Sequence, residues 1–315
     1  MIGKIREACR QVEVDAIIGY RKKEGEPREI LHVFKPDEID KITFSPLSSN
    51  NPARLLMEIL PTMNKVAVIA KGCDVRAIRE LVKENKIDRN KIYIIGVSCD
   101  GVVDYRKFRR AVQFRLNEIE SVELDGEDLI VKANGKEQRF KFADVMSEVC
   151  KHCPNPTPKD YDVLIGEPKE GKEDFSDIEE IEKMSAEERW NYWMDIFSKC
   201  IRCHACRQVC PVCYCEECLV DPVNLAISPM TPAEEKASYP RVLGKTVNSS
   251  DNLIYHLVRV LHHAGRCARC GECERACPME LPLTKLERKL WKVVQEEFGY
   301  SPDEDIPFLS KLDMG

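Results

Sequence analysis

The sequence has no hydrophobic run long enough to cross a membrane and no large excess of either charge. A membrane helix needs about 20 consecutive apolar residues, and no stretch of the 315 residues approaches that length. The first residues, Met1–Arg6, contain no apolar signal core. The net charge of −6, with 32% charged residues, gives no indication of a nucleic-acid partner or an acidic membrane surface. We therefore expect a cytoplasmic protein with no membrane span.

Cysteine is what the sequence has in quantity, with sixteen in the chain. Disulfides rarely persist in the cytosol, so this number indicates metal or redox chemistry. Eight of the cysteines form two copies of the pattern Cys-x-x-Cys-x-x-Cys-x-x-x-Cys-Pro, one from Cys200 to Pro211 and one from Cys267 to Pro278. This is the pattern with which bacterial-type ferredoxins bind iron–sulfur cubanes. Structural zinc usually uses paired Cys-x-x-Cys motifs with longer gaps.

The two copies predict two 4Fe–4S clusters that exchange their fourth ligand. In this pattern three cysteines bind one cluster, and the cysteine before proline reaches across to the other cluster. The expected ligands are Cys200, Cys203, Cys206 and Cys277 for cluster 1, and Cys210, Cys267, Cys270 and Cys273 for cluster 2. Three more cysteines, Cys213, Cys215 and Cys218, are extra or alternative ligands.

The first half of the chain predicts an α/β domain. Apolar runs at Val14–Tyr20, Ile30–Phe34, Val66–Ala70 and Ile92–Val97 predict strands. Helical spacing over Val75–Glu84 predicts a helix between the last two strands, which makes a parallel crossover unit.

Residues 121–142 predict a small antiparallel meander. Apolar and polar side chains alternate there, and Asp125-Gly126 and Asn134-Gly135 are strong hairpin signals.

Four cysteines of the first half predict a third cluster. Cys73 and Cys99 each follow a predicted strand, and ligands of open α/β sheets bind beyond the carboxyl ends of strands. Cys150 and Cys153, in a Cys-x-x-Cys-Pro motif, bring the thiols to the four that a cubane needs. We favour a cluster over a thioredoxin-like dithiol, and a zinc site built from the same four cysteines stays open. Cys9 is expected to be a buried thiol.

The second half is expected to be mainly α-helical. We place the α/β domain at residues 1–160, an acidic linker at 161–189, a two-cluster ferredoxin domain at 190–300 and an extended tail at 301–315. Ser185 begins a capping box for the helix that enters the first cysteine run.

A second helix, Leu253–His263, is predicted to lead into the second cysteine run, capped by Ser249, Ser250 or Asp251. We expect His262 and His263 near the surface rather than as ligands, and His152 in a solvated loop.

These motifs resemble a known family. Lys71–Ile78, Ile94–Cys99 and Cys150–Pro154 resemble the beta-subunit family shared by hydrogenases that reduce the deazaflavin coenzyme F420 and by formate dehydrogenases. Cys200–Pro211 is similar to the ferredoxin part of formate dehydrogenase beta subunits, and the second half also resembles the HdrC component of heterodisulfide reductases.

The resemblance implies an iron–sulfur subunit of an anaerobic oxidoreductase complex. It would relay single electrons between a catalytic subunit and a flavoprotein partner, with no catalytic residue of its own. Several family members bind FAD, so the alternative is an FAD-containing subunit that exchanges a hydride with a deazaflavin or nicotinamide. Gly72, Gly96 and Gly101 are the candidate flavin-binding residues. In this chain the ferredoxin part follows the α/β part, whereas the hydrogenase subunits carry it first.

Overall fold

The computed structural model describes residues 1–315 except 217, 221–229, 239–242, 244–246 and 314–315. The chain divides into two compact units. The first unit comprises Met1–Asp174, Ala268–Gly271 and Asp305–Pro307. The second unit comprises Phe175–Cys267, Glu272–Glu304 and Phe308–Gly315. No helix of the described residues is both long and apolar enough to cross a membrane.

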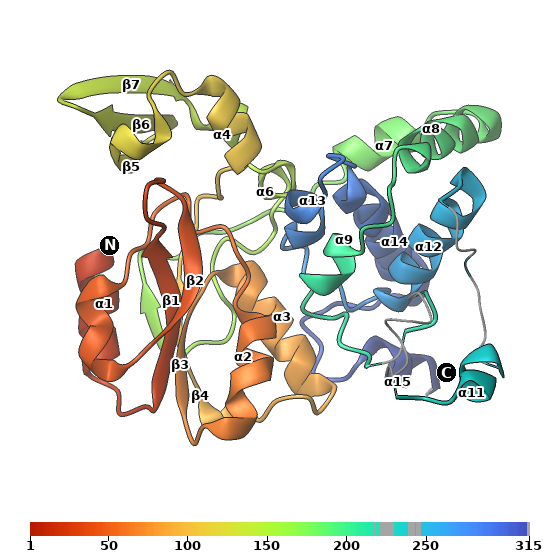
Figure 1. The fold of residues 1–315 in the computed structure, drawn as a ribbon, viewed down its shortest axis with the longest axis horizontal. Helices are drawn as coiled ribbons and strands as arrows, with labels where there is room; N and C mark the ends of the chain where they lie inside the picture. Colours follow the sequence, from red (N-terminus) through yellow and green to blue (C-terminus); the bar gives the residue numbers. More distant parts are fainter. Residues whose placement is uncertain (217, 221–229, 239–242, 244–246, 314–315) are drawn as a thin grey trace. The chain divides into compact units, whose positions relative to one another are not determined.

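A five-stranded sheet forms the centre of the first unit, in the order β2-β1-β3-β4-β8 (Figure 1). Its strands are β1 (Ala16–Lys22), β2 (Glu29–Phe34), β3 (Val66–Ala70), β4 (Ile92–Val97) and β8 (Val163–Ile165). β1, β3, β4 and β8 run parallel, and β2 is antiparallel to β1. Every residue of β3 is buried, which explains its uninterrupted apolar run. The four predicted strands are confirmed; β8 is an additional one.

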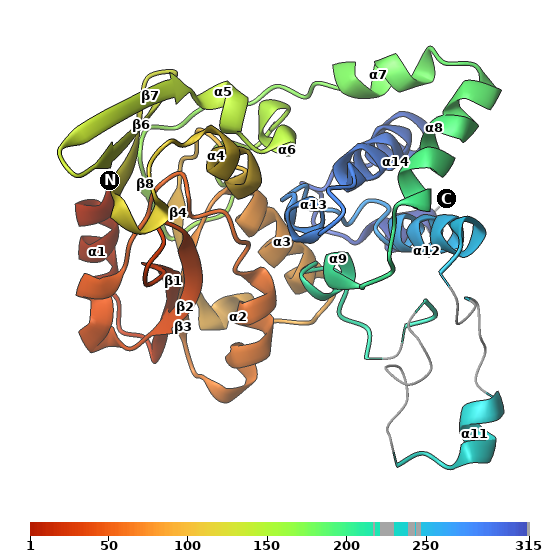
Figure 2. The ribbon, with the colours of Figure 1, turned by 45° about the horizontal axis from the view of Figure 1, so that its top comes forward.

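Helices cover both faces of this sheet. α1 (Ile2–Arg10) lies on one face, and α2 (Ala53–Ile59) and α3 (Gly72–Lys83) lie on the other (Figures 1 and 2). α3 joins the parallel neighbours β3 and β4, so the predicted crossover unit is confirmed. The shorter helices of this unit are η1 (Pro36–Lys41), η2 (Leu60–Thr62), η3 (Arg89–Lys91), α4 (Tyr105–Ala111), η4 (Leu116–Glu118), α5 (Phe142–Val145) and α6 (Glu148–Lys151).

The predicted meander forms a separate three-stranded antiparallel sheet. Its strands are β5 (Ile119–Asp125), β6 (Asp128–Ala133) and β7 (Lys136–Lys141), and it has its own apolar core. Gly126 and Gly135, at φ of 60° and 72°, make the two turns, because a left-handed backbone favours glycine.

The described part of the second unit contains helices and no strand. The helices are α7 (Ser176–Glu182), α8 (Ala186–Ser198), α9 (Ala205–Gln208), α11 (Ala233–Ser238), α12 (Ser249–His262), α13 (Glu272–Ala276), α14 (Leu283–Phe298) and α15 (Phe308–Asp313). The capping box of α8 is confirmed, because Ser185 Oγ accepts from Glu188 N at 3.2 Å and Glu188 Oε2 accepts from Ser185 N at 2.7 Å.

Three features of the second half differ in detail from the sequence expectation. The cap of α12 is Asn248, whose side chain accepts from Asp251 N at 2.8 Å, rather than one of the three residues that follow it. β8 and α7 lie within the 161–189 segment expected as a linker. α15 lies within the 301–315 segment expected as an extended tail.

Candidate metal centres

The four expected thiols of the first unit come together at one end of the sheet. β3 and β4 are paired up to Ala70 and Gly96, so the segments that follow them lie side by side. Burial, and then the neighbouring Cys150, raise the pKa of Cys99 to about 12, with a smaller contribution from Cys153. Burial and Asp74 raise the pKa of Cys73. Cys270, in the Ala268–Gly271 segment of the same unit, and Cys153 add smaller contributions.

Close backbone packing fixes this group of thiols. A Cβ on Gly72 would lie 1.9 Å from the carbonyl oxygen of Asn155, so only glycine lets the loop after Cys153 approach the start of α3. Cys99 N donates to Pro156 O at 2.8 Å. Gly101 N donates to the sulfur of Cys99 at 3.3 Å, an N–H···S bond of the kind that tunes iron–sulfur centres.

A buried lysine, which the sequence analysis did not single out, lies beside the thiols. The side chain of Lys71 is 3% exposed, and its Nζ lies 2.9 Å from Asp74 Oδ2. Its Nζ also donates to Tyr20 OH at 2.6 Å and to Ser48 O at 3.0 Å. Burial alone would lower the pKa of Lys71, but Asp74 and Tyr20 raise that pKa well above the usual value. Lys71 therefore places a fixed positive charge beside the thiols, where it lowers the pKa of both Cys73 and Cys99.

The three candidate flavin glycines lie against the protein itself. Gly72 abuts Asn155, a Cβ on Gly96 would lie 3.0 Å from Tyr161 Cβ, and one on Gly101 would lie 3.2 Å from the Met146 side chain. The space that each glycine leaves is filled by this chain.

The four cysteines expected for cluster 1 line one cavity of about 10 Å³ in the second unit. Cys200, Cys206 and Cys277 are buried, and Cys203 is exposed. Burial raises the pKa of Cys200, and the charges of Cys206, Cys277 and Cys203 raise it further. The structure therefore brings Cys277 of the second run to three cysteines of the first.

The cavity has room for about one water molecule, so a cluster would require the four cysteines to move apart. Two features of the lining suit a cluster. His256 lines it, is 1% exposed, and has no hydrogen-bond partner for either ring nitrogen among the described residues. Burial lowers its pKa to about 3, so the ring is neutral and keeps one N–H. A cluster sulfur would accept that N–H. Tyr255 OH and Arg202 N already lie 3.4 Å from the sulfurs of Cys206 and Cys200, respectively.

The two cysteine runs share a backbone conformation. Arg202 and Arg269, each before the second cysteine of its run, have φ of 47° and 54°. His204 and Gly271, each after that cysteine, have φ of 60° and 74°. α9 and α13, which carry Cys206 and Cys273, pack against each other. The sequence repeat is therefore also a structural repeat.

The cysteines expected for cluster 2 are brought together only in part. Burial opposes the charge of Arg259, whereas Cys206, Glu287, Cys273 and Cys210 raise its pKa. Cys210 and Cys273 thus lie near one guanidinium in the second unit. Cys267 N donates to His263 O at 3.1 Å, and Cys270 lies in the Ala268–Gly271 segment of the first unit.

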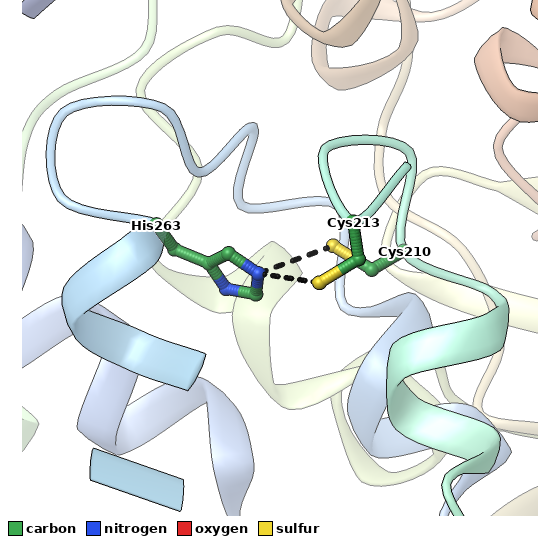
Figure 3. Close-up of side chains that lie close together, drawn as sticks. All are labelled: Cys210, Cys213 and His263. Carbon is green, nitrogen blue, oxygen red and sulfur yellow. Dashed lines mark hydrogen bonds between the residues drawn. The ribbon is translucent and has the colours of Figure 1, made fainter. Parts of the chain in front are cut away.

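His263 is the main correction to the sequence analysis (Figure 3). It was expected near the surface, but it is 2% exposed. Its Nε2 lies 2.9 Å from Cys213 Sγ and 3.9 Å from Cys210 Sγ, and its Nδ1 lies 2.8 Å from Glu287 Oε1. These two thiols and the ring nitrogen form a possible metal-ligand group, with all donor atoms within 4.8 Å of one another. His263 follows α12 by one residue and stands four positions before Cys267, which was the available signal.

Charge is separated within this group. A hydrogen bond with Cys210 lowers the pKa of Cys213 to about 3; burial opposes this effect and His263 adds to it. Burial opposes protonation of His263, but Glu287 and Cys213 raise its pKa to about 9. Glu287 and Cys213 thus favour the protonated ring of His263, and His263 favours the thiolate of Cys213.

Two smaller expectations have opposite outcomes. Cys9 is 2% exposed, as expected, and burial raises its pKa to about 11. His152 is not a solvated loop residue, because its side chain is 13% exposed and its Nδ1 lies 2.7 Å from Asp174 Oδ2.

Comparisons with known proteins match the resemblance of the motifs. Residues 63–193 match the family model for the C terminus of the coenzyme F420 hydrogenase/dehydrogenase beta subunit. The F420-dependent formate dehydrogenase subunit beta of Methanocaldococcus jannaschii is 26% identical over 308 residues, covering 79% of this chain and 77% of the relative. The F420-dependent formate dehydrogenase 1 subunit beta of Methanococcus maripaludis is 27% identical over 306 residues, covering 76% of this chain and 73% of the relative.

Among solved structures, a chain of the F420-reducing NiFe hydrogenase complex from Methanosarcina barkeri aligns with a TM-score of 0.40 and 16% identity. The alignment covers 49% of this chain and 58% of that chain.

Proposed function

Because residues 63–193 are a domain of the coenzyme F420 hydrogenase/dehydrogenase beta-subunit family, we propose that this chain is an iron–sulfur electron-transfer subunit of an oxidoreductase complex. The observation that supports this most directly is the cavity that Cys200, Cys203, Cys206 and Cys277 line together. Four thiolates from two segments of the chain are what a cubane requires. The ring nitrogens of His256 in the same cavity, which have no hydrogen-bond partner among the described residues, support the same assignment.

The proposed ligand sets follow the groups of thiols. Cluster 1 is bound by Cys200, Cys203, Cys206 and Cys277. Cluster 2 is bound by Cys210, Cys267, Cys270 and Cys273. A third cluster is bound by Cys73, Cys99, Cys150 and Cys153.

When bound, each cluster takes up and releases one electron at a time. The protein's contribution is to exclude water, to donate N–H groups to the sulfurs and to balance charge. Burial of Cys200 and Cys206 excludes water, Arg202 N and Gly101 N donate, and Lys71 balances charge. No proton transfer is required of any residue in the relay.

The proposed partner is a catalytic oxidoreductase subunit, because the two formate dehydrogenase relatives are named as beta subunits. A flavoprotein of a heterodisulfide-reductase-like complex is the proposed second partner, on the resemblance of the cysteine runs alone. The flavin alternative is not supported by the glycines, which abut the chain itself.

The test is an anaerobic count of iron, acid-labile sulfide, zinc and flavin in matched variants. We expect Cys277→Ser and Cys99→Ser each to lose about four irons per chain, because each removes a ligand of a different 4Fe–4S cluster. Cys9→Ser, which removes a buried thiol outside every proposed site, is the control and should retain all iron.

Three results would change the proposal. Unchanged iron in Cys277→Ser would contradict the ferredoxin clusters. Loss of one zinc instead of iron in Cys99→Ser would make the first-unit site a zinc site. Flavin bound in stoichiometric amount would restore the alternative function.

A further inference from the structure

Four cysteines remain outside every proposed ligand set, and three of them, all but Cys9, line one cavity. Cys213, Cys215 and Cys218 line a space of about 310 Å³ in the second unit, together with His263. A space of that size is at the lower end of the range of ligand sites. It is far larger than the 10–15 Å³ or so that a single water molecule needs.

His263 is oriented as a metal ligand. Its Nδ1 is held by Glu287 Oε1 at 2.8 Å, which leaves Nε2 directed toward Cys213 Sγ at 2.9 Å. Metal-binding histidines usually have their far nitrogen fixed by a carboxylate in this way. The side chains of His263 and Glu287 are only 1% and 5% exposed, so this orientation is built into the interior. Cys210 lies farther from Nε2, at 3.9 Å, and is already assigned to cluster 2.

Arginines that line the cavity hold the part of the loop that carries Cys213 and Cys215. Arg207 donates to the carbonyl oxygen of Cys215 at 2.9 Å. Arg266 donates to Tyr214 OH at 3.1 Å, and its guanidinium lies 5.5 Å from the centre of that ring. Together with Arg259, these residues put three guanidinium groups around the cavity. Their positive charge offsets the charge of three thiolates.

We propose that Cys213, Cys215, Cys218 and His263 bind a further iron–sulfur cluster, separate from the two ferredoxin clusters and from the first-unit site. Histidine replaces cysteine at iron in some iron–sulfur centres, so three thiolates and one imidazole form an adequate ligand set. The alternative occupant of the same donors is one zinc ion, which the metal count below distinguishes.

The experiment compares Cys218→Ser and Cys215→Ser with the unchanged protein and with Cys9→Ser, all purified anaerobically as full-length chains. Iron, sulfide and zinc are counted, and the reduced proteins are examined by electron paramagnetic resonance. We expect each of the two variants to lose about four irons per chain while the signals assigned to the ferredoxin clusters remain. Cys9→Ser should lose none.

A fourth variant, His263→Cys, tests the imidazole directly. A cysteine there supplies a thiolate in place of the imidazole, so the iron content should be retained. The resonance signal that Cys218→Ser removes should be present and shifted, because one ligand of one iron has changed.

Unchanged iron in both Cys218→Ser and Cys215→Ser would overturn the proposal, as would loss of one zinc instead of iron. The proposed function fails separately, through unchanged iron in Cys277→Ser. The proposal of a separate cluster would also be overturned if both loop variants lost all their iron and Cys9→Ser lost none. That result would mean that the loop is needed to stabilise the ferredoxin fold.

Discussion

At the scale of the residue, three buried polar side chains of this protein lie beside its thiols. Lys71 lies beside Cys73, His256 lines the cavity of Cys200, and His263 contacts Cys213. A buried polar group needs a partner, because desolvation without one costs about 1–3 kcal/mol. Two of these side chains are satisfied within the protein. The ring nitrogens of His256 have no partner among the described residues, so we expect that residue to interact with whatever the cavity holds.

His256→Phe tests that expectation. Phenylalanine keeps the stacking on Phe197, whose ring lies 4.7 Å from that of His256, and removes the N–H. Hydrogen bonds to sulfur stabilise the reduced, more negative cluster. We expect the reduction potential of cluster 1 to fall while the iron content is retained, as measured by potentiometric titration with resonance detection. His32→Phe, in β2, is the control, and an equal fall there would contradict the assignment.

Gly72→Ala tests the close approach that fixes the first-unit thiols. The new Cβ would overlap the carbonyl oxygen of Asn155, so either α3 or the loop after Cys153 must move. We expect a loss of about 1–3 kcal/mol in the free energy of unfolding, measured by anaerobic urea denaturation. Gly3→Ala is the matched control, because nothing lies within 4 Å of its Cβ. If Gly72→Ala were as stable as that control, the loop would be able to move without a loss in the free energy of unfolding.

Glu29→Gln tests a pH dependence of stability. Burial raises the pKa of Glu29, although Ser48 and Ser45 donate hydrogen bonds to its carboxylate and oppose the shift. Between pH 4.5, the ordinary pKa of the group, and the raised pKa, the carboxyl of Glu29 is therefore protonated in the folded protein but ionised in the unfolded chain. Stability should fall as pH rises through that window and level off above it.

In Glu29→Gln this fall should disappear, as seen in urea midpoints measured between about pH 5 and 8. Glu24→Gln changes the same charge at an exposed position and should keep the pH profile of the unchanged protein. Identical profiles for Glu29→Gln and the unchanged protein would show that another group is responsible.

At the scale of the element, the sequence predicts best where one local signal determines the structure. β3 and β4 were predicted to the residue because buried parallel strands are continuous apolar runs. α8 was predicted from its capping box. β8 was missed because its three residues stand among charged ones, and only pairing with β4 makes them a strand. The cap of α12 was misplaced because Asn248 competes with three other good capping residues.

Ser185→Ala tests the capping box of α8. Removing the hydroxyl leaves Glu188 N without its acceptor, which costs about 0.5–2 kcal/mol of helix stability. We expect faster hydrogen exchange of the amides in the first turn of α8. Ser198→Ala, at the other end of the same helix, should leave those amides unchanged. Equal exchange in the two variants would mean that packing, not the cap, holds this turn.

At the scale of the whole molecule, ten of the sixteen cysteines belong to the second unit. Cys200, Cys206 and Cys277 are members of its apolar core, alongside Phe197 and Tyr255. In the main core of the first unit the sheet packs around aliphatic side chains, Phe34 and Cys9. The spacing of the cysteine runs is visible in the sequence. The membership of Ala268–Gly271 in the first unit could not be predicted, because it depends on tertiary contacts.

Removal of the proposed clusters should therefore affect the two units unequally. We expect chelation under oxidising conditions to speed hydrogen exchange strongly in α12, which packs on the second-unit core, and little in β3, which is buried among aliphatic residues. The measurement is exchange mass spectrometry before and after chelation, with the untreated protein as control. Equal acceleration in both elements would mean that the chain unfolds as one cooperative body.

The fixed ammonium of Lys71 bears on how fast a relay can operate. Its charge is held in place by Tyr20, Ser48 and Asp74 before any electron arrives. A pre-oriented charge spares the reorganisation that mobile water or a moving side chain would require when the charge of the site changes. In the proposed relay, an electron reaching the first-unit thiols would find its counter-charge already positioned, so its transfer need not wait for a proton or for a conformational change.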